Sequence, residues 1–128
     1  MPGVMLMEET AVATRAVVVQ SRPDVASGLS ASLAAVGVEA LVVADGQTAL
    51  SVVGTWDPAV VLVDLTLPAL DGWYVLAAVG AFADRPLLVV RVEHASDAAR
   101  AIALGADAWV DDDLHVVGAA GRLAAIAA

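Results

Sequence analysis

A single carboxylate, Asp64, stands where the chain changes from an apolar run to a turn-rich segment. Residues 60–63 are Val-Val-Leu-Val, and residues 65–72 contain a proline, a second aspartate and a glycine. An apolar run of this kind is typical of a central strand that is buried on both faces of a parallel sheet. Open α/β sheets bind their ligands at the carboxyl ends of such strands, so the sequence predicts that Asp64 faces a candidate reactive site.

The basic residues of the chain limit the chemistry that is available at Asp64. There is no lysine, and the six basic residues are all arginines. Any reaction at Asp64 that requires a lysine of this chain is therefore excluded. The absence of cysteine also excludes disulfides and thiolate metal sites, and it fits a cytoplasmic protein.

Charge and hydropathy exclude further classes of function. The net charge of −9 repels phosphate, so we expect no direct contact with nucleic acid or with an anionic membrane surface. Apolar residues make up 60% of the chain, but their runs are well short of the roughly 20 residues that span a bilayer. No segment has the pattern of a secretory signal. We therefore expect a cytoplasmic protein that does not bind to or span a membrane.

Short apolar runs alternate with helical stripes along most of the chain. The expected strands cover residues 16–20, 39–44, 59–64, 87–91 and 108–110. The expected helices cover residues 24–37, 46–54, 72–80, 96–105 and 114–127. We expect Ser96 to cap the fourth helix, and Trp73, Leu76 and Ala77 to share one side of the third.

Five β-α units at this spacing predict an α/β, flavodoxin-like fold. Its doubly wound, five-stranded parallel sheet has strand order 2-1-3-4-5. We expect residues 1–14 to form a disordered arm and residues 15–128 to form a single domain. Strand order reverses between the first and third strands, so the side chains that follow the strands should meet near Asp64. These side chains are Gln20, Ser21, Arg22, Arg91 and the acidic run Asp111, Asp112 and Asp113.

Several short motifs occur together in a recognisable order. They are Ala44-Asp45-Gly46 with Ala49-Leu50, then Val63-Asp64, Leu67-Pro68 and Asp71-Gly72, then Leu104-Gly105-Ala106-Asp107. With these motifs the chain resembles a response-regulator receiver domain over residues 15–127. The resemblance implies two-component signal transduction, often in transcription regulation, with Asp64 in the position of the phosphoacceptor.

The other site positions depart from the receiver pattern. The resemblance implies an acidic pair that holds Mg²⁺, but Gln20 and Ser21 stand there; Arg91 replaces a threonine or serine, and Asp112 replaces a lysine. A carboxylate that attacks a phosphoryl group needs a divalent cation and a second donor to neutralise the developing charge. Thr66 could offer a metal only its backbone carbonyl.

We therefore interpret Asp64 as the vestige of a phosphoacceptor. We expect no metal and no cofactor, with Mg²⁺ needed only if Asp64 still accepts phosphate. In this altered pocket Arg91 is predicted to form an ion pair with Asp64, Asp112 or both. The alternative is that Arg91 points to solvent and that the acidic run is a hydrated loop.

A candidate interaction surface is formed by residues 96–105, 108–110 and 114–127. Charged residues that could form ion pairs across it are Asp97, Arg100, Asp107 and Arg122. Trp109 occupies the position of an aromatic switch residue in the resembled family; here it either packs within the chain or contacts a partner. Trp56 and Trp73 are interpreted as packing residues, and His94 and His115 lack metal-ligand spacing.

We predict a non-enzymatic, phosphorylation-independent signalling module. It would act as a homodimer or by binding another regulatory protein. The first alternative is that a histidine kinase still phosphorylates Asp64, with a weak Mg²⁺ site completed by Asp112 or water. The second is a receiver that senses a small-molecule ligand in the altered pocket or on the interaction surface.

Overall fold

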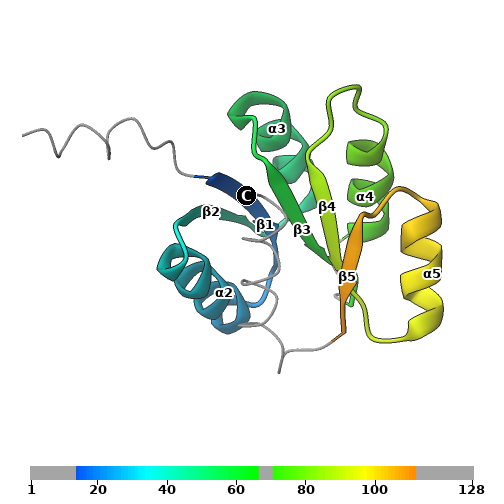
Figure 1. The fold of residues 1–128 in the computed structure, drawn as a ribbon, viewed down its shortest axis with the longest axis horizontal. Helices are drawn as coiled ribbons and strands as arrows, with labels where there is room; N and C mark the ends of the chain where they lie inside the picture. Colours follow the sequence, from blue (N-terminus) through cyan, green and yellow to red (C-terminus); the bar gives the residue numbers. More distant parts are fainter. Residues whose placement is uncertain (1–13, 67–70, 112–128) are drawn as a thin grey trace, which may run out of the picture.

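The computed structural model describes residues 14–66 and 71–111 of the 128-residue chain. Elements are numbered as in Figure 1. The described strands are β1 (Thr14–Val19), β2 (Val38–Val43), β3 (Val60–Asp64), β4 (Leu87–Arg91) and β5 (Ala108–Val110). The described helices are α2 (Pro23–Ala35), α3 (Gly46–Trp56), α4 (Gly72–Gly80) and α5 (Ala95–Ala103).

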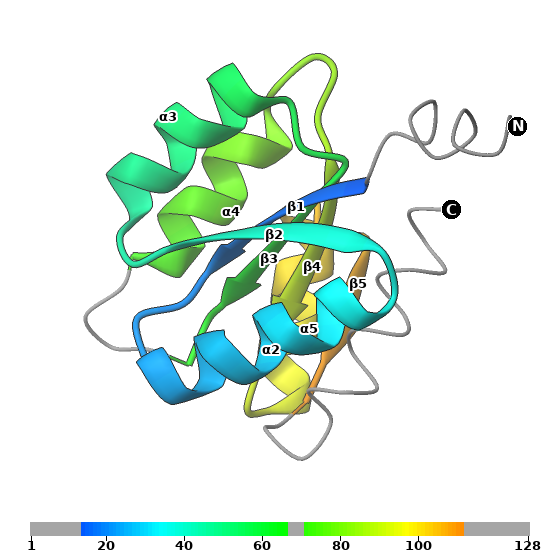
Figure 2. The same ribbon diagram turned by 90° about the vertical axis from the view of Figure 1, so that its left-hand side faces the viewer.

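The five strands form one parallel sheet in the order β2-β1-β3-β4-β5. The predicted flavodoxin-like fold with strand order 2-1-3-4-5 is therefore confirmed. Figure 2 shows α2 on one face of the sheet and α3 and α4 on the other. The carboxyl ends of β1, β3 and β4 lie at the same edge, which is where such sheets place their ligands.

The core consists of two apolar clusters, one on each face of the sheet. On β1, Val17 and Val19 join the cluster beneath α3, α4 and α5, whereas Ala16 and Val18 join the cluster beneath α2. Side chains on a strand point alternately to opposite faces, so a strand that is covered on both sides is apolar at every position. This explains why the strands read as continuous apolar runs in the sequence.

Two of the sequence motifs are helix caps. The Asp45 carboxylate accepts the Thr48 amide at 2.8 Å and thereby starts α3. The Asp71 carboxylate accepts the Tyr74 amide at 3.4 Å at the start of α4. An aspartate in this position satisfies an amide that the helix itself leaves without a partner, so the Asp-Gly pairs have a structural role here.

The expected cap of the fourth helix is wrong. The cap of α5 is His94, whose carbonyl accepts the amides of Asp97 and Ala98, so Ser96 lies inside the first turn. On α4 the buried side contains Gly72, Val75, Leu76 and Val79, while Ala77 is exposed and Trp73 is half-buried. Of the side predicted to be shared by Trp73, Leu76 and Ala77, Leu76 is buried and Trp73 packs partly against the core.

The ends of the chain are only partly described. Of the expected arm, Thr14 belongs to β1 and pairs with Val38. The rest of that arm and the expected helix at residues 114–127 lie outside the described residues. Among the helices that the structure describes, none has the length and apolarity of a membrane span.

Candidate functional site

Asp64 and Arg91 are the last residues of two neighbouring strands. They are register partners in the β3–β4 ladder, and the Leu65 amide donates to the Arg91 carbonyl at 2.9 Å. Asp64 is only 2% exposed. The backbone thus fixes the two side chains at the carboxyl edge of the sheet, next to each other and largely out of water.

The ion pair that was expected between Arg91 and Asp64 is present. Arg91 Nη1 lies 3.2 Å from Asp64 Oδ1 and 3.3 Å from Oδ2. Only 14% of the Arg91 side chain is exposed, so the alternative in which Arg91 points to solvent is wrong. The guanidinium thereby covers both oxygens of the carboxylate.

Thr66 links both members of this ion pair. Its amide and its hydroxyl donate to Asp64 Oδ1 at 2.8 and 2.6 Å, and its hydroxyl oxygen accepts from Arg91 Nη1 at 2.6 Å. An aspartate that binds the amide two residues later forms a local turn, which the Asp-x-Thr spacing favours. The sequence analysis considered Thr66 only as a carbonyl ligand of a metal, whereas the structure makes its hydroxyl a central contact of the site.

Gln20 completes the shell around Asp64. It is buried at the end of β1, and its Nε2 donates to Asp64 Oδ2 at 2.7 Å, while its Oε1 accepts the Arg22 amide at 3.0 Å. Ser21 is exposed and makes no hydrogen bond within the part of the chain that the structure describes. Of the two residues that replace the acidic pair, Gln20 thus enters the site and Ser21 does not.

This arrangement does not fit Mg²⁺, which receiver domains that accept phosphate require. Mg²⁺ binds oxygen lone pairs, usually from one or two carboxylates. Here both Asp64 oxygens already accept hydrogen bonds from Gln20, Thr66 and Arg91, and the Gln20 oxygen accepts from the backbone. Across residues 14–66 and 71–111 no group of three or more acidic, histidine or cysteine side chains could hold a metal ion.

The remaining predicted site residues lie either outside the described residues or at the start of α5. Asp112, Arg122 and His115 lie outside the described residues, so an Arg91–Asp112 pair stays a prediction. His94 is exposed at the start of α5, with Nε2 3.9 Å from a Glu93 oxygen. Asp97 lies in the first turn of the same helix, where a negative charge is favoured by the helix dipole.

Asp107, a predicted ion-pair partner across the interaction surface, is instead occupied within the chain. Its two oxygens bind Arg85 Nη1 and Nη2 at 2.8 and 3.0 Å, and Oδ2 also accepts the Leu88 amide at 2.8 Å. The Arg85 hydrogen bonds hold the pKa of Asp107 below its usual value, and the same contact raises the pKa of Arg85. Asp107 thus has a structural role within the chain, and its expected cross-subunit role stays a prediction.

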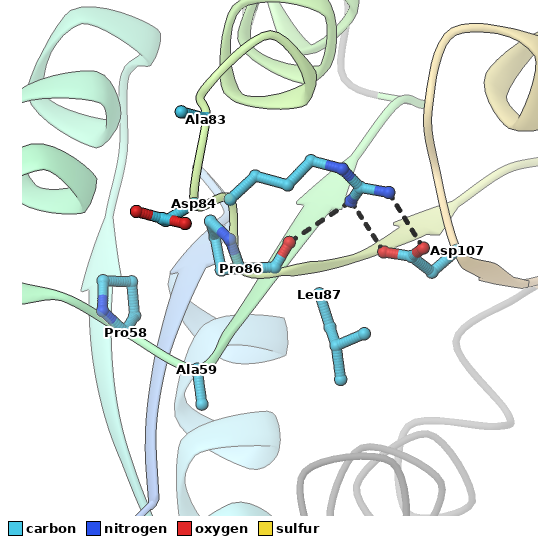
Figure 3. Close-up of a pocket in the computed structure, with 8 residues that line it drawn as sticks. Pro58, Ala59, Ala83, Asp84, Pro86, Leu87 and Asp107 are labelled. Carbon is cyan, nitrogen blue, oxygen red and sulfur yellow. Dashed lines mark hydrogen bonds and ion pairs between the residues drawn. The ribbon is translucent and has the colours of Figure 1, made fainter.

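The Arg85–Asp107 pair borders a shallow hollow at the amino edge of the sheet, opposite to Asp64. Its volume is about 540 Å³. Arg85 binds Asp107 at one side of it, and Figure 3 shows that the Asp84 carboxylate points away from Asp107. The hollow is lined by Pro58, Ala59, Ala83, Asp84, Arg85, Pro86, Leu87 and Asp107.

The tryptophans differ in their surroundings. Trp73 packs against the core, and the Arg100 guanidinium lies over its ring at 4.3 Å from the centroid, so Arg100 already has a contact within the chain. Trp56 also packs against the core, beneath Arg15 at 5.2 Å. Trp109 is 44% exposed on the edge strand β5. Packing therefore accounts for Trp56 and Trp73, while Trp109 presents its ring to solvent.

Comparisons with known proteins agree with the fold. No protein-family model matches the chain. The chain is 31% identical over 83 residues to the "Probable transcriptional regulator ycf27" of Porphyridium aerugineum. This match covers 64% of the chain and 35% of that protein, so the chain spans about a third of the length of the curated relative that it matches.

Solved receiver domains have the same architecture. The receiver domain of the Francisella response regulator 1452 superposes with a TM-score of 0.75 at 16% identity, covering 90% of this chain and 99% of that one. A CheY-like receiver domain protein from Methanospirillum hungatei gives a TM-score of 0.75 at 15% identity, covering 91% and 97%. The chain therefore has the fold of a response-regulator receiver domain. The resemblance predicted from its motifs is confirmed at the level of fold.

Proposed function

We propose that this chain is the receiver-type module of a response regulator, and that it works without phosphorylation of Asp64. The observation that supports this proposal best is the set of donors around the Asp64 carboxylate. Gln20, Thr66 and Arg91 each donate to this carboxylate, and together they bind both of its oxygens. The pair with Arg91 thus takes the place of a phosphoryl group and its metal ion.

The chemistry of phosphoryl transfer supports the same reading. A carboxylate that attacks phosphorus needs a free lone pair on the attacking oxygen and a divalent cation on the transferred group. The Arg91 and Asp64 side chains are both largely buried, so the ion pair between them is shielded from water in the folded state. Removing one partner of such a buried pair costs about 3–5 kcal/mol, which opposes opening of the site to a phosphodonor.

The output of this module is proposed to be a protein contact on the surface of α5 and β5. We define the α5–β5 surface by three apolar side chains, Ile102, Leu104 and Trp109, which are 45%, 41% and 44% exposed. An apolar patch that several exposed side chains form together is typical of a contact site, and tryptophan is enriched where such contacts are strongest. Asp97 and Arg100 lie on the same helix and supply charges at its border.

A second copy of this chain is the proposed occupant of the α5–β5 surface, with another regulatory protein as the alternative. The name of the Porphyridium relative supports a place in transcription regulation. The charge of −9 makes direct binding of nucleic acid by this module unfavourable. We therefore expect the module to act through its contact with another protein chain.

The direct test is intact-protein mass spectrometry after incubation with acetyl phosphate and Mg²⁺. We expect an unchanged mass for this chain, while a phosphorylatable receiver domain in the same tube gains one phosphoryl group. The Asp64→Asn variant serves as the matched control for labelling elsewhere. A phosphoryl adduct that the wild-type chain forms and Asp64→Asn does not would overturn the proposed function.

A further inference from the structure

We propose that Trp73 and Arg100 form a second tether between α4 and α5, and that this tether is energetically coupled to the Asp64–Arg91 ion pair. The proposal deepens the proposed function, in which that ion pair takes the place of a phosphoryl group and its metal ion. It assigns a role to a contact that lies outside the altered phosphorylation site. The tether would keep α5, and with it the α5–β5 surface, in one position.

Two arginines from one segment of the chain reach the same neighbouring segment. Arg91 ends β4, and α5 begins at Ala95 after a short connection, with Arg100 in its last turn. Arg91 contacts Asp64 and Thr66 at the end of β3, and Arg100 lies over Trp73 at the start of α4. The β4–α5 segment is thus held to the β3–α4 segment at two points.

The two points are connected by close packing at the first residue of α4. A Cβ atom built on Gly72 would lie 3.1 Å from the Asp64 carbonyl oxygen and 3.0 Å from Leu65 Cδ2. Glycine thus allows α4 to begin directly against the residue that binds Arg91, and Trp73 follows it. Little freedom remains between the ion pair and the tryptophan, because dense packing transmits displacement.

Two tethers between the same segments should reinforce each other. Once one tether is formed, the second closes at a high effective concentration, so it costs less entropy than it would alone. The sign of this coupling free energy distinguishes two reinforcing tethers from repulsion between two charges. Repulsion between two positive guanidinium groups would produce the opposite sign, since removal of one arginine would then relieve the other.

A double-mutant cycle of Arg91→Gln and Arg100→Gln, followed by urea unfolding, tests the coupling. We expect the double variant to be less destabilised than the two single effects predict, by about threefold or more in the unfolding equilibrium constant. If Arg91→Gln does not fold, Thr66→Val replaces it, because this substitution removes the hydroxyl that accepts from Arg91 without removing a charge. A double variant that matches the product of the single effects to within about twofold would overturn the proposal.

The chain offers a matched control in its other arginine–tryptophan contact. Arg15 lies over Trp56 and donates to its carbonyl at 3.0 Å, at the amino end of β1 and far along the sheet from Asp64. The effect of Arg15→Gln should multiply with that of Arg91→Gln. Equal coupling of both arginines to Arg91 would mean a non-specific effect and would also overturn the tether.

A local readout separates the tether from a general loss of stability. In NMR spectra of folded Arg91→Gln, the indole N–H resonance of Trp73 should shift, while that of Trp56 should stay in place. Both experiments are performed without phosphodonor or Mg²⁺. Their outcome therefore does not depend on whether Asp64 can be phosphorylated, and failure of the tether is distinguishable from failure of the proposed function.

Discussion

Asp64 and Arg91 end adjacent parallel strands in the same register, and the guanidinium of Arg91 lies across both oxygens of the Asp64 carboxylate at 3.2 and 3.3 Å. The position of Asp64 is that of a reactive carboxylate at the mouth of an α/β sheet. Its contacts are those of a buried charge partner. This contrast between position and contacts is the basis of the proposed function.

The ion pair should matter for stability. We expect Arg91→Gln to lower the free energy of unfolding by about 3 kcal/mol, because it leaves the Asp64 carboxylate buried without its cation. Asp64→Asn should lower the free energy of unfolding by a similar amount, because it leaves the Arg91 guanidinium buried without its anion. Urea unfolding checks both, and the double variant should recover part of the loss. Wild-type stability in Arg91→Gln would mean that the pair contributes nothing.

The Thr66 hydroxyl should also contribute measurably. Thr66→Val keeps the shape of the side chain but removes a group that donates to Asp64 and accepts from Arg91. We expect a loss of about 1–3 kcal/mol, since buried polar partners lose a hydrogen bond. The matched control is Thr55→Val, which removes an exposed hydroxyl bonded to the Ser51 carbonyl. That variant should stay within about 0.5 kcal/mol of wild type, and equal losses at the two positions would contradict a special role of Thr66.

The Arg85–Asp107 pair should give the protein part of its acid sensitivity. The pKa of Asp107 is lowered in the folded state, chiefly by its hydrogen bonds to Arg85. A depressed pKa adds stability above the unfolded-state pKa of about 3.9, and this stability is lost as the pH falls through the lower folded value. In Asp107→Asn the decline of stability in acid should therefore be shallower than in wild type.

Unfolding midpoints between about pH 5 and pH 2 measure this difference. Asp84→Asn is the control, because its carboxylate borders the same hollow but points away from Asp107 (Figure 3). It should follow the wild-type pH profile. An Asp107→Asn profile that runs parallel to wild type would show that the pair does not set the acid response.

The sequence predicted the elements best where burial and turn residues agree. The bounds of α4, β4 and β5 match the expected ranges: α4 begins and ends at a glycine, β4 begins after Pro86, and β5 lies between two aspartates. The expected end of α3 at Gly54 is two residues early. The helix continues to Trp56 and ends at Asp57, which adopts a left-handed conformation with φ 53°. Aspartate adopts this conformation more often than most residues but still rarely, so its presence alone does not mark the end of a helix.

The candidate site was predictable in outline. The position of Asp64 follows from the apolar run that it ends, whereas its pairing with Arg91 was predicted from the site positions of the resembled family and is present in the structure. The hydroxyl of Thr66 was missed, although the Asp-x-Thr spacing is a known turn signal. The Arg85–Asp107 and Arg100–Trp73 contacts join residues far apart in the sequence: the first depends on the pairing of β4 with β5, and the second on the packing of α5 beside α4.

The α5–β5 surface should control self-association. We expect Trp109→Ala to shift the chain toward monomer in sedimentation equilibrium, because the lost ring is exposed in the single chain and is a contact group of the proposed dimer. The control is Leu41→Ala, which removes an apolar side chain, 38% exposed, from β2 at the opposite edge of the sheet. That variant should associate like wild type. Equal association of wild type and Trp109→Ala would remove Trp109 from the interface.

The most direct measurement of the central claim is an amide NMR titration with beryllofluoride and Mg²⁺, which together imitate a phosphorylated aspartate. An Asp64 whose oxygens are already bound by Gln20, Thr66 and Arg91 should not accept the ligand. We expect the amide spectrum to remain unchanged at every concentration of the two reagents. Saturable shifts that begin at Asp64 and extend to Trp109 would contradict it, because they would reveal a working phosphorylation switch.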